Sequence, residues 1–433
     1  MLFIEDYEIY TLQIPLGRMI GDNNCHYDEI EVLCINLKTN HGHMGWGYAE
    51  SVWKGTFTRG AWYIKQLPSH SELDVLFQQT WWPLLKNQDP NNLELIRKNF
   101  HSGLSQMDAA IRLAMWDLMA QDKNVPLYKL LNPTCMKQEA LSYGSILDYP
   151  LSDDETVALT KNFLNGGFSI IKIKIGAPDV ARDIARIKLI QSVAGNSIKL
   201  TADANEAWTW QIALDRIEAY QKNGIQLEYI EDPLPNDDIK GFKELTSRSP
   251  IPIIGHDYIN NFEQIHELVN EGGIHGIRTG KDIDYALQCI ELATKHNLPV
   301  YLGNSIFEIN AHLALAFNQV NRTEFSLLNT NDIIENPIVF KNGNLPSALR
   351  AGISYPFYLR PLNIDNKLLF DGGLYNSFPI DVMQKEFHPD FIIGSNVSEK
   401  KQKPDEDNLY LQIRSLLTNQ TDSNSFIKNG III

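Results

Sequence analysis

The chain has 433 residues, of which 43% are hydrophobic, and carries a formal net charge of −15. Its length exceeds that of a typical single domain, so we expect two or more domains with real cores. The acidic balance argues against a nucleic-acid partner, because phosphate binding needs a basic face.

No apolar run approaches the roughly 20 residues of a membrane span. Residues 1–10 lack a signal-peptide pattern, and the four cysteines lack CxxC spacing. We therefore expect a cytoplasmic protein without membrane partners.

The first 135 residues have a mixed α+β pattern. An apolar-rich segment at 30–37 predicts a strand, and a turn-rich stretch follows at 40–47. Helical periodicity dominates from about residue 93 to residue 131. The predicted buried face of this helical region contains Ile111, Ala114, Met115 and Leu118. We predict an α+β domain over residues 1–135.

From Ala140 onward, short apolar strands alternate with amphipathic helices, such as those at 179–193 and 207–223. The interval of roughly 25 residues is typical of βα units with a parallel sheet. The predicted strands are 140–145, 168–175, 198–203, 226–231, 251–257, 274–279, 298–303 and 323–328. Eight such strands predict a closed barrel, whose active site lies at the carboxyl ends of the strands. We assign residues 136–343 to this barrel.

A lysine pair marks the second predicted strand, where residues 170–176 read IIKIKIG. Lys172 and Lys174 are two residues apart and so share one face of the strand. Burying two like charges costs several kcal/mol unless anions compensate them. The alternative is that both lysines extend from a strand end into solvent.

Acidic residues end the next three strands. Asp203 ends the third predicted strand, Glu231 the fourth and Asp257 the fifth. Each one alone could be a helix N-cap or a turn residue. Three carboxylates on adjacent strand ends would repel one another without a cation. Oxygen ligands favour a hard ion, so the pattern predicts a Mg²⁺ site.

These segments resemble the mandelate racemase/muconate lactonizing enzyme branch of the enolase superfamily. The resemblance rests on the lysine pair, on the segments 203–205 (DAN) and 231–233 (EDP), and on the strand order. It extends to N-terminal segments at 37–48, 111–118 and 126–131, and covers the chain up to about Gly343. It implies an α/β fold, in which an α+β capping domain covers a modified (β/α)7β TIM-type barrel. It also implies a homo-oligomer acting on a small-molecule carboxylate.

The resemblance further implies removal of the substrate α-proton through a metal-stabilised enediolate. Mg²⁺ would be held by Asp203, Glu231 and the acid of the fifth strand. Lys174 is the expected base, with a pKa lowered by Lys172 and the cation, while Lys172 would mainly hold the substrate carboxylate. Both a metal and a base are needed, because neither alone supplies the ~8–23 kcal/mol that enzymes typically remove from a barrier.

The chain departs from the family pattern in three places. The fifth strand ends in His256-Asp257, so His256 is the alternative metal ligand or acid/base. The sixth strand has Arg278 in the register of a second lysine, and Lys281 follows it. Arginine is a poor base, so Arg278 could bind the carboxylate or form a structural ion pair, with Lys281 as the second acid/base. Asn304 stands where some relatives have a histidine.

The remaining substrate-binding candidates are Asn205, Asn304, Glu324, Tyr143 and His26. Glu324 matches an acidic residue that contacts substrate in some relatives. The specificity loops of the cap would be residues 14–28 and 50–53. Their polar side chains suit a hydroxylated substrate, although loops are polar in any case.

Residues 344–433 are expected to be a separate, partly flexible segment of uncertain fold. They resemble the end of a patatin-like hydrolase domain through residues 348–356, the DGG turn at Asp371 and residues 389–397. The chain has no GxSxG segment to supply the nucleophilic serine, so patatin-type hydrolysis is not expected.

The leading hypothesis is dehydration of an acid sugar. The alternatives are epimerisation or racemisation of a small carboxylate, including dipeptides, and a catalytically degenerate metal-binding protein.

Overall fold

The computed structural model describes residues 2–52, 54–58, 64–92, 94–95, 104–147, 150–195, 198–259, 261–303 and 305–326. Beyond these it describes residue 388 and short strands at 362–364, 367–369, 392–394 and 430–432. The chain divides into two compact units, Met1–Asn329 and Thr330–Ile433. The predicted boundary at 343 and the patatin-like DGG turn lie outside the described residues, so the three-part division stays a prediction.

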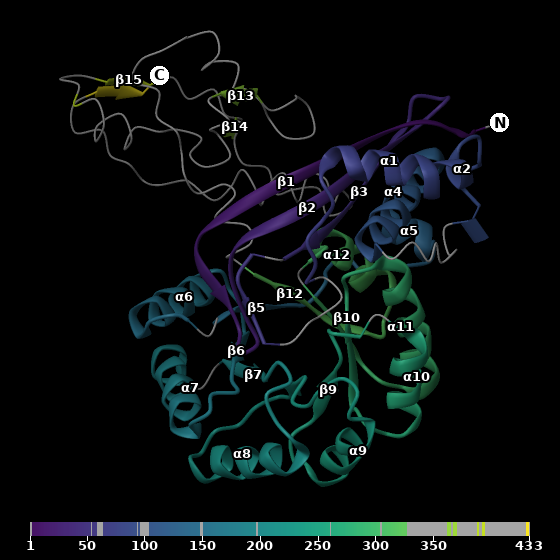
Figure 1. Ribbon diagram of the computed structural model, residues 1–433. Helices are drawn as coiled ribbons and strands as arrows, with labels where there is room; N and C mark the ends of the chain where they lie inside the picture. The colour runs from purple at the N-terminus through teal and green to yellow at the C-terminus, as the bar shows by residue number, and fades with distance from the viewer. Residues whose placement is uncertain are drawn as a thin grey trace. The chain divides into compact units, whose positions relative to one another are not determined.

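The N-terminal region forms an antiparallel sheet packed on helices. Its strands are β1 (Ile4–Gly21), β2 (Cys25–Thr39), β3 (Met44–Ser51) and the short β4 (Thr56–Phe57). β2 pairs with β1, β3 and β4. The helices are α1 (His70–Thr80), α2 (Trp82–Leu85), α4 (Ser105–Lys123) and α5 (Leu127–Leu131). This is the predicted α+β cap (Figure 1).

The predicted apolar face of α4 is buried: Ile111, Ala114, Met115 and Leu118 are all inaccessible to solvent. The turn-rich interpretation of residues 40–47 was wrong in part, because residues 44–47 belong to β3. Gly47 lies so close to the α4 backbone that a Cβ atom there would collide with the Ala110 carbonyl. Gly45 and Gly47 therefore allow close sheet–helix packing rather than a turn.

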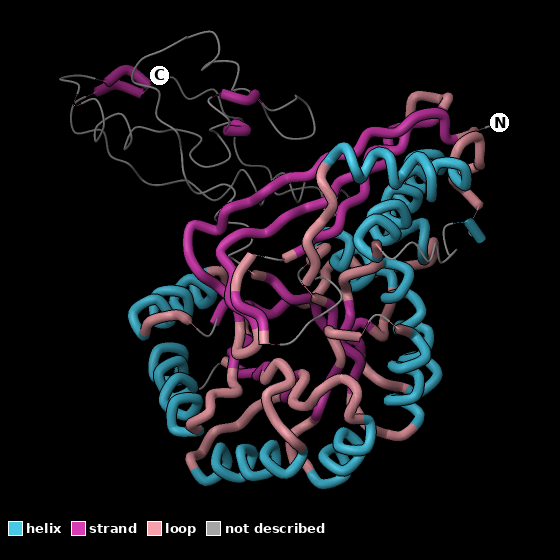
Figure 2. The backbone as a smooth tube through the Cα atoms, viewed as in Figure 1, coloured by secondary structure: helices cyan, strands magenta, loops and turns pink. Residues whose placement is uncertain are grey.

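The barrel closes in the strand order β10-β11-β12-β5-β6-β7-β8-β9, with every described pair parallel. The strands are β5 (Ser142–Leu147), β6 (Ile170–Lys174), β7 (Lys199–Asp203), β8 (Ile230–Glu231), β9 (Ile253–Gly255), β10 (Gly276–Thr279), β11 (Val300–Leu302) and β12 (Val320–Phe325). All eight predicted strands are confirmed. Figure 2 shows them surrounded by helices.

One helix follows each of the first seven barrel strands, which is the predicted (β/α)7β arrangement. These helices are α6 (Asp153–Asn165), α7 (Val180–Ala194), α8 (Trp210–Lys222), α9 (Ile239–Arg248), α10 (Phe262–Asn270), α11 (Ile283–His296) and α12 (Phe307–Ala316). Alternate apolar strand residues such as Ile171 and Ile173 are buried against them. None of the helices in the described part of the chain has both the length and the apolar character needed to cross a bilayer.

Candidate active site

The two lysines of β6 point into the barrel. Lys172 is 2% exposed and Lys174 17% exposed at the side chain. The Nζ of Lys174 lies 2.7 Å from Asp203 Oδ2 and 3.0 Å from Asn205 Oδ1. The alternative of lysines extended into solvent is therefore wrong. Both amines reach anions that compensate their charge.

The two strands that follow β6 supply carboxylates at matching positions. Lys174 pairs in register with Asp203 at the end of β7, and Asp203 pairs with Glu231 at the end of β8. Both acids are almost fully buried. The carboxyl ends of parallel barrel strands meet at one rim, so their acids converge there.

Lys172 is held deep in the barrel by three carboxylates. Its Nζ lies 3.4 Å from Asp203 Oδ2, 3.2 Å from Glu231 Oε1 and 3.1 Å from Glu324 Oε1. An ammonium has three donors, and here all three face acids of the protein. Lys172 could hold a substrate carboxylate, as predicted, only by giving up one of these contacts.

The carboxylates around Lys174 determine the direction of its pKa shift in this structure. Burial works to lower this pKa, but attraction by Asp203 and Asp22 outweighs burial and raises the pKa well above its usual value. The lowering of this pKa by Lys172 and a bound cation stays a prediction.

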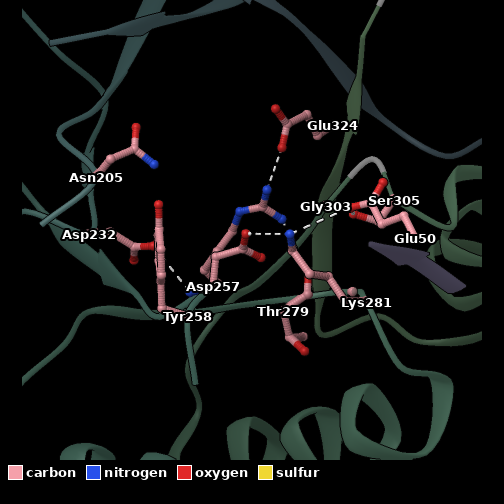
Figure 3. Close-up of polar contacts among 12 residues, drawn as sticks. Glu50, Asn205, Asp232, Asp257, Tyr258, Thr279, Lys281, Gly303, Ser305 and Glu324 are labelled. Atoms are coloured by element: carbon pink, nitrogen blue, oxygen red, sulfur yellow. Dashed lines mark hydrogen bonds and ion pairs between the residues drawn. The ribbon is translucent and has the colours of Figure 1, made fainter. Parts of the chain in front are cut away.

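Asp257 lies two residues beyond β9 and faces Lys281. Its Oδ2 is 3.4 Å from Lys281 Nζ, and its Oδ1 is buried without a hydrogen-bond partner. Burial works to raise the pKa of Asp257, but Lys281 and Arg278 lower it. Lys281 also lies 3.7 Å from Glu50 Oε1 of the cap, and Ser305 donates to the same oxygen at 2.6 Å (Figure 3).

His256 is fully buried, and both of its ring nitrogens have partners. Nδ1 accepts from the Tyr258 backbone N–H at 3.2 Å, and Nε2 lies 3.1 Å from the Leu234 carbonyl oxygen. These contacts describe a neutral imidazole with its proton on Nε2. Burial also lowers the pKa of His256. The geometry favours Asp257 over His256 as the third metal ligand.

A cavity of about 100 Å³ joins these groups between cap and barrel. Its described lining contains six carboxylates and four cations, an excess of two negative charges. The acids are Asp22, Glu50, Asp203, Glu231, Asp257 and Glu324, and the cations are Lys172, Lys174, Arg278 and Lys281. A divalent cation would balance this excess.

The donor set fits Mg²⁺, although the acids do not already form a metal site. In the described residues no three His, Cys, Asp or Glu side chains are grouped to hold a metal ion. Asp203 and Glu231 instead contact lysine and arginine. To bind a metal they would exchange some of these contacts, whereas Asp257 Oδ1 already lacks a partner. Carboxylate oxygens are the ligands that Mg²⁺ prefers.

Two family models match most of the chain. Residues 25–132 match the N-terminal domain of mandelate racemase/muconate lactonizing enzyme, and residues 155–357 match the enolase C-terminal domain-like model. The chain belongs to the mandelate racemase/muconate lactonizing enzyme branch of the enolase superfamily. The second match runs past residue 343 and so includes the start of the predicted C-terminal segment.

Known relatives of this enolase-superfamily chain catalyse different reactions. It is 28% identical over 347 residues to L-Ala-D/L-Glu epimerase of Bacillus subtilis (strain 168), covering 75% of this chain and 88% of the relative. It is 25% identical over 353 residues to arabinonate dehydratase of Saccharolobus solfataricus, with the same coverage. A racemase from Streptomyces coelicolor A3(2), solved with bound magnesium, shares the fold: the TM-score is 0.65 at 21% identity, covering 75% and 89% of the two chains. The chain is therefore a lyase or an isomerase.

Only some of the other predicted substrate-binding residues line the cavity of this enolase-superfamily site. Asn205 and Glu324 line the cavity, whereas Tyr143 and His26 are not among its described lining residues. The hydroxyl of Tyr143 lies 3.5 Å from Glu324 Oε2. Asn304 lies outside the described residues. The roles of Tyr143, His26 and Asn304 stay predictions.

Several residues that line the cavity were not predicted from the sequence as site residues. Ser145 of β5, Ser326 after β12 and Cys25 of the cap also line the cavity. Small uncharged residues at strand ends give no chemical signal by themselves. Ser145 shares a strand face with Tyr143, a predicted substrate contact two residues earlier, and strand alternation could have identified it for this reason.

Proposed function

We propose that this protein removes the α-proton of a small carboxylate substrate, with Lys174 as the base and Asp203, Glu231 and Asp257 as ligands of Mg²⁺. The observation that carries the proposal is the meeting of Lys174 and these three acids at one cavity. When bound, the metal supplies charge stabilisation to the substrate carboxylate. The lysine supplies the proton acceptor.

Lys281 is the proposed partner of Lys174. β6, which carries Lys174, and β10, which Lys281 follows, are four places apart in the eight-stranded ring. The two amines therefore approach the cavity from opposite walls. Lys174 would take the α-proton on one side, and Lys281 would deliver a proton to a departing β-hydroxyl group on the other. The hydroxyl leaves as water, and the electron pair of the C–H bond forms the C=C bond of an enol.

Dehydration of an acid sugar is the reaction that we favour. Arg278 has the register expected of a second base, but its guanidinium is held by Glu231 and Glu324 and stays protonated. The cap side of the cavity offers Asp22, Glu50 and Tyr27. Carboxylate oxygens accept hydrogen bonds from hydroxyl groups, which an acid sugar has in number.

Epimerisation of an amino-acid derivative is the second candidate. The position of Lys281 opposite Lys174 also suits removal of a proton from one face and its return to the other. The same acidic cap residues, Asp22 and Glu50, could bind an ammonium group. The similarity to L-Ala-D/L-Glu epimerase of Bacillus subtilis (strain 168) favours this candidate as well.

A proton-exchange experiment separates these reactions. The full chain would be incubated with Mg²⁺ and a library of acid sugars and dipeptides in D₂O and followed by ¹H NMR. We expect an acid sugar to lose its α-proton signal and form a 2-keto-3-deoxy acid. Exchange at the α-carbon without a new compound would support epimerisation instead.

Lys174→Ala is the decisive variant. We expect it to slow turnover of the substrate found in this screen by about 10²–10⁴-fold, the range of general acid–base catalysis. Lys199→Ala serves as the matched control, because Lys199 lies on the neighbouring strand with an exposed side chain. Its rate should be unchanged. If the protein binds Mg²⁺ but exchanges no proton with any compound, it is a degenerate member and the proposal fails.

A further inference from the structure

Four alternate strands of the barrel each contribute one buried charged side chain to its interior. β6 contributes Lys172, β8 Glu231, β10 Arg278 and β12 Glu324. Around the closed barrel these strands are separated by one strand each. Alternate strands of a TIM-type barrel fill its interior in layers of four side chains, which are usually apolar and bulky. Here one layer alternates cation and anion.

The four side chains form a closed ring of ion pairs. Arg278 Nε lies 2.7 Å from Glu231 Oε1, and Glu231 Oε1 lies 3.2 Å from Lys172 Nζ. Lys172 Nζ lies 3.1 Å from Glu324 Oε1, and Glu324 Oε2 accepts from Arg278 Nη2 and so closes the ring. We call these four residues the ionic ring. Its formal charge is zero, so the excess negative charge of the cavity lies outside it.

The guanidinium of Arg278 is fixed on every side. Beyond its two carboxylates, its Nη1 donates to the Thr279 carbonyl oxygen at 3.1 Å. Gly303 makes room for it: a Cβ atom there would lie 2.8 Å from Nη1 and 3.4 Å from Cζ. Arg278 is 3% exposed, so its charge acts on Glu231 with little screening by solvent.

One member of the ionic ring, Glu231, is also a proposed ligand of the metal. Glu231 can hold a divalent cation only if it shares or gives up the contacts made by Arg278 and Lys172. We propose, on the basis of that function, that Arg278 competes with the metal for Glu231 and thereby keeps the Mg²⁺ affinity of the site low. The ring also provides the anions of the barrel with counter-ions before any metal binds.

Metal titration of the full chain tests this inference without any substrate. Mg²⁺ binding would be measured by isothermal titration calorimetry for the unmodified protein, Arg278→Gln and Arg278→Lys. We expect Arg278→Gln to bind Mg²⁺ at least about tenfold more tightly, because a cation beside a ligand is removed. Arg278→Lys keeps the charge and should stay within about threefold of the unmodified protein.

A second variant should change the Mg²⁺ affinity in the opposite direction. Glu324→Gln removes an anion of the ring that is not a proposed ligand, so the remaining cations repel the metal and the Kd should rise by about tenfold. Arg112→Gln is the control for general destabilisation. Arg112 is a half-buried arginine paired with Asp282, and it is not among the described lining residues of the cavity. It should lower the melting temperature without changing the Kd.

The outcomes separate the inference from the proposed function. If the unmodified protein binds Mg²⁺ and Arg278→Gln binds it equally or less tightly, Arg278 does not compete with the metal and the inference is overturned. If Arg278→Gln fails to fold, a Glu324→Gln variant that binds as tightly as the unmodified protein overturns it as well. If the unmodified protein binds no Mg²⁺ at all, the proposed function itself is wrong.

Discussion

The predicted third metal ligand, Asp257, and its alternative, His256, have different surroundings in the structure. His256 uses both ring nitrogens on the backbone and is fully buried. Asp257 lines the cavity and has an oxygen without a partner. Of these two residues, only Asp257 is among the described lining residues of the cavity.

Asp257→Asn tests this assignment. The amide keeps the shape but removes the charge, so we expect the Mg²⁺ Kd to rise by about tenfold or more, since affinity follows the ligand charge. The measurement is calorimetric titration of the full chain.

His256→Gln is the matched control for Asp257→Asn, and its Kd should change by less than about threefold. The reverse pattern, with a large loss in His256→Gln and none in Asp257→Asn, would place His256 on the metal.

At the level of elements, the cap depends on close contact between β3 and α4. Gly45 and Gly47 face this helix, and a Cβ atom on Gly47 would meet the Ala110 carbonyl and the Ala114 amide nitrogen. Both are backbone atoms, which cannot rotate away as the end of a flexible side chain could. The backbone itself would have to move, and interiors packed like crystals resist such shifts.

Gly47→Ala should therefore lower the free energy of unfolding by about 1–3 kcal/mol, the usual cost of overpacking. Urea denaturation followed by circular dichroism measures it. Gly166→Ala is the control, because its nearest neighbours lie at an ordinary 3.4 Å. That variant should be within about 0.5 kcal/mol of the unmodified protein. Equal stability of both variants would refute the packing argument.

At the scale of the whole cap-and-barrel unit, several polar contacts join the two parts. The Nδ2 of Asn24 donates to the Asn205 carbonyl, and the hydroxyl of Tyr48 donates to Glu308. On the other side, His312 of α12 accepts from the Tyr128 backbone N–H through Nδ1 at 3.3 Å. A protonated imidazole could not accept this hydrogen bond.

His312 makes stability depend on pH. Burial lowers its pKa to about 4, below the unfolded value of 6.5. Between these values the unfolded chain binds the proton more readily, so stability is lost as pH falls from about 6.5 toward 4. We expect the unmodified protein to lose about 1–2 kcal/mol more than His312→Gln between pH 7 and pH 5, allowing for partial solvent exposure.

The control for His312→Gln is His296→Gln, since His296 is exposed in the last turn of α11. It should keep the pH profile of the unmodified protein. Urea midpoints at several pH values provide the comparison. Identical profiles for His312→Gln and the unmodified protein would show that His312 does not titrate in this range.

Much of this fold could be predicted from local patterns. The period of apolar residues located all eight barrel strands, because parallel strands buried on both sides need continuous apolar runs. The spacing of Lys172 and Lys174 predicted that both share one face of the strand. The ends of the strands were less certain: the strand predicted at 226–231 is only Ile230–Glu231. Strand ends depend on pairing with neighbours, which the segment itself does not contain.

The sequence by itself determined the barrel, the cap and the acids and lysines that share the rim, because periodicity and strand direction are properties of each segment. Only the tertiary structure decided which charges meet. The ionic ring joins residues 172, 231, 278 and 324, which are far apart along the chain. Ion pairs between such residues depend on barrel closure and on distances of a few ångströms. For the same reason Asp203 and Asp22, which the fold brings close to Lys174, raise its pKa in this structure.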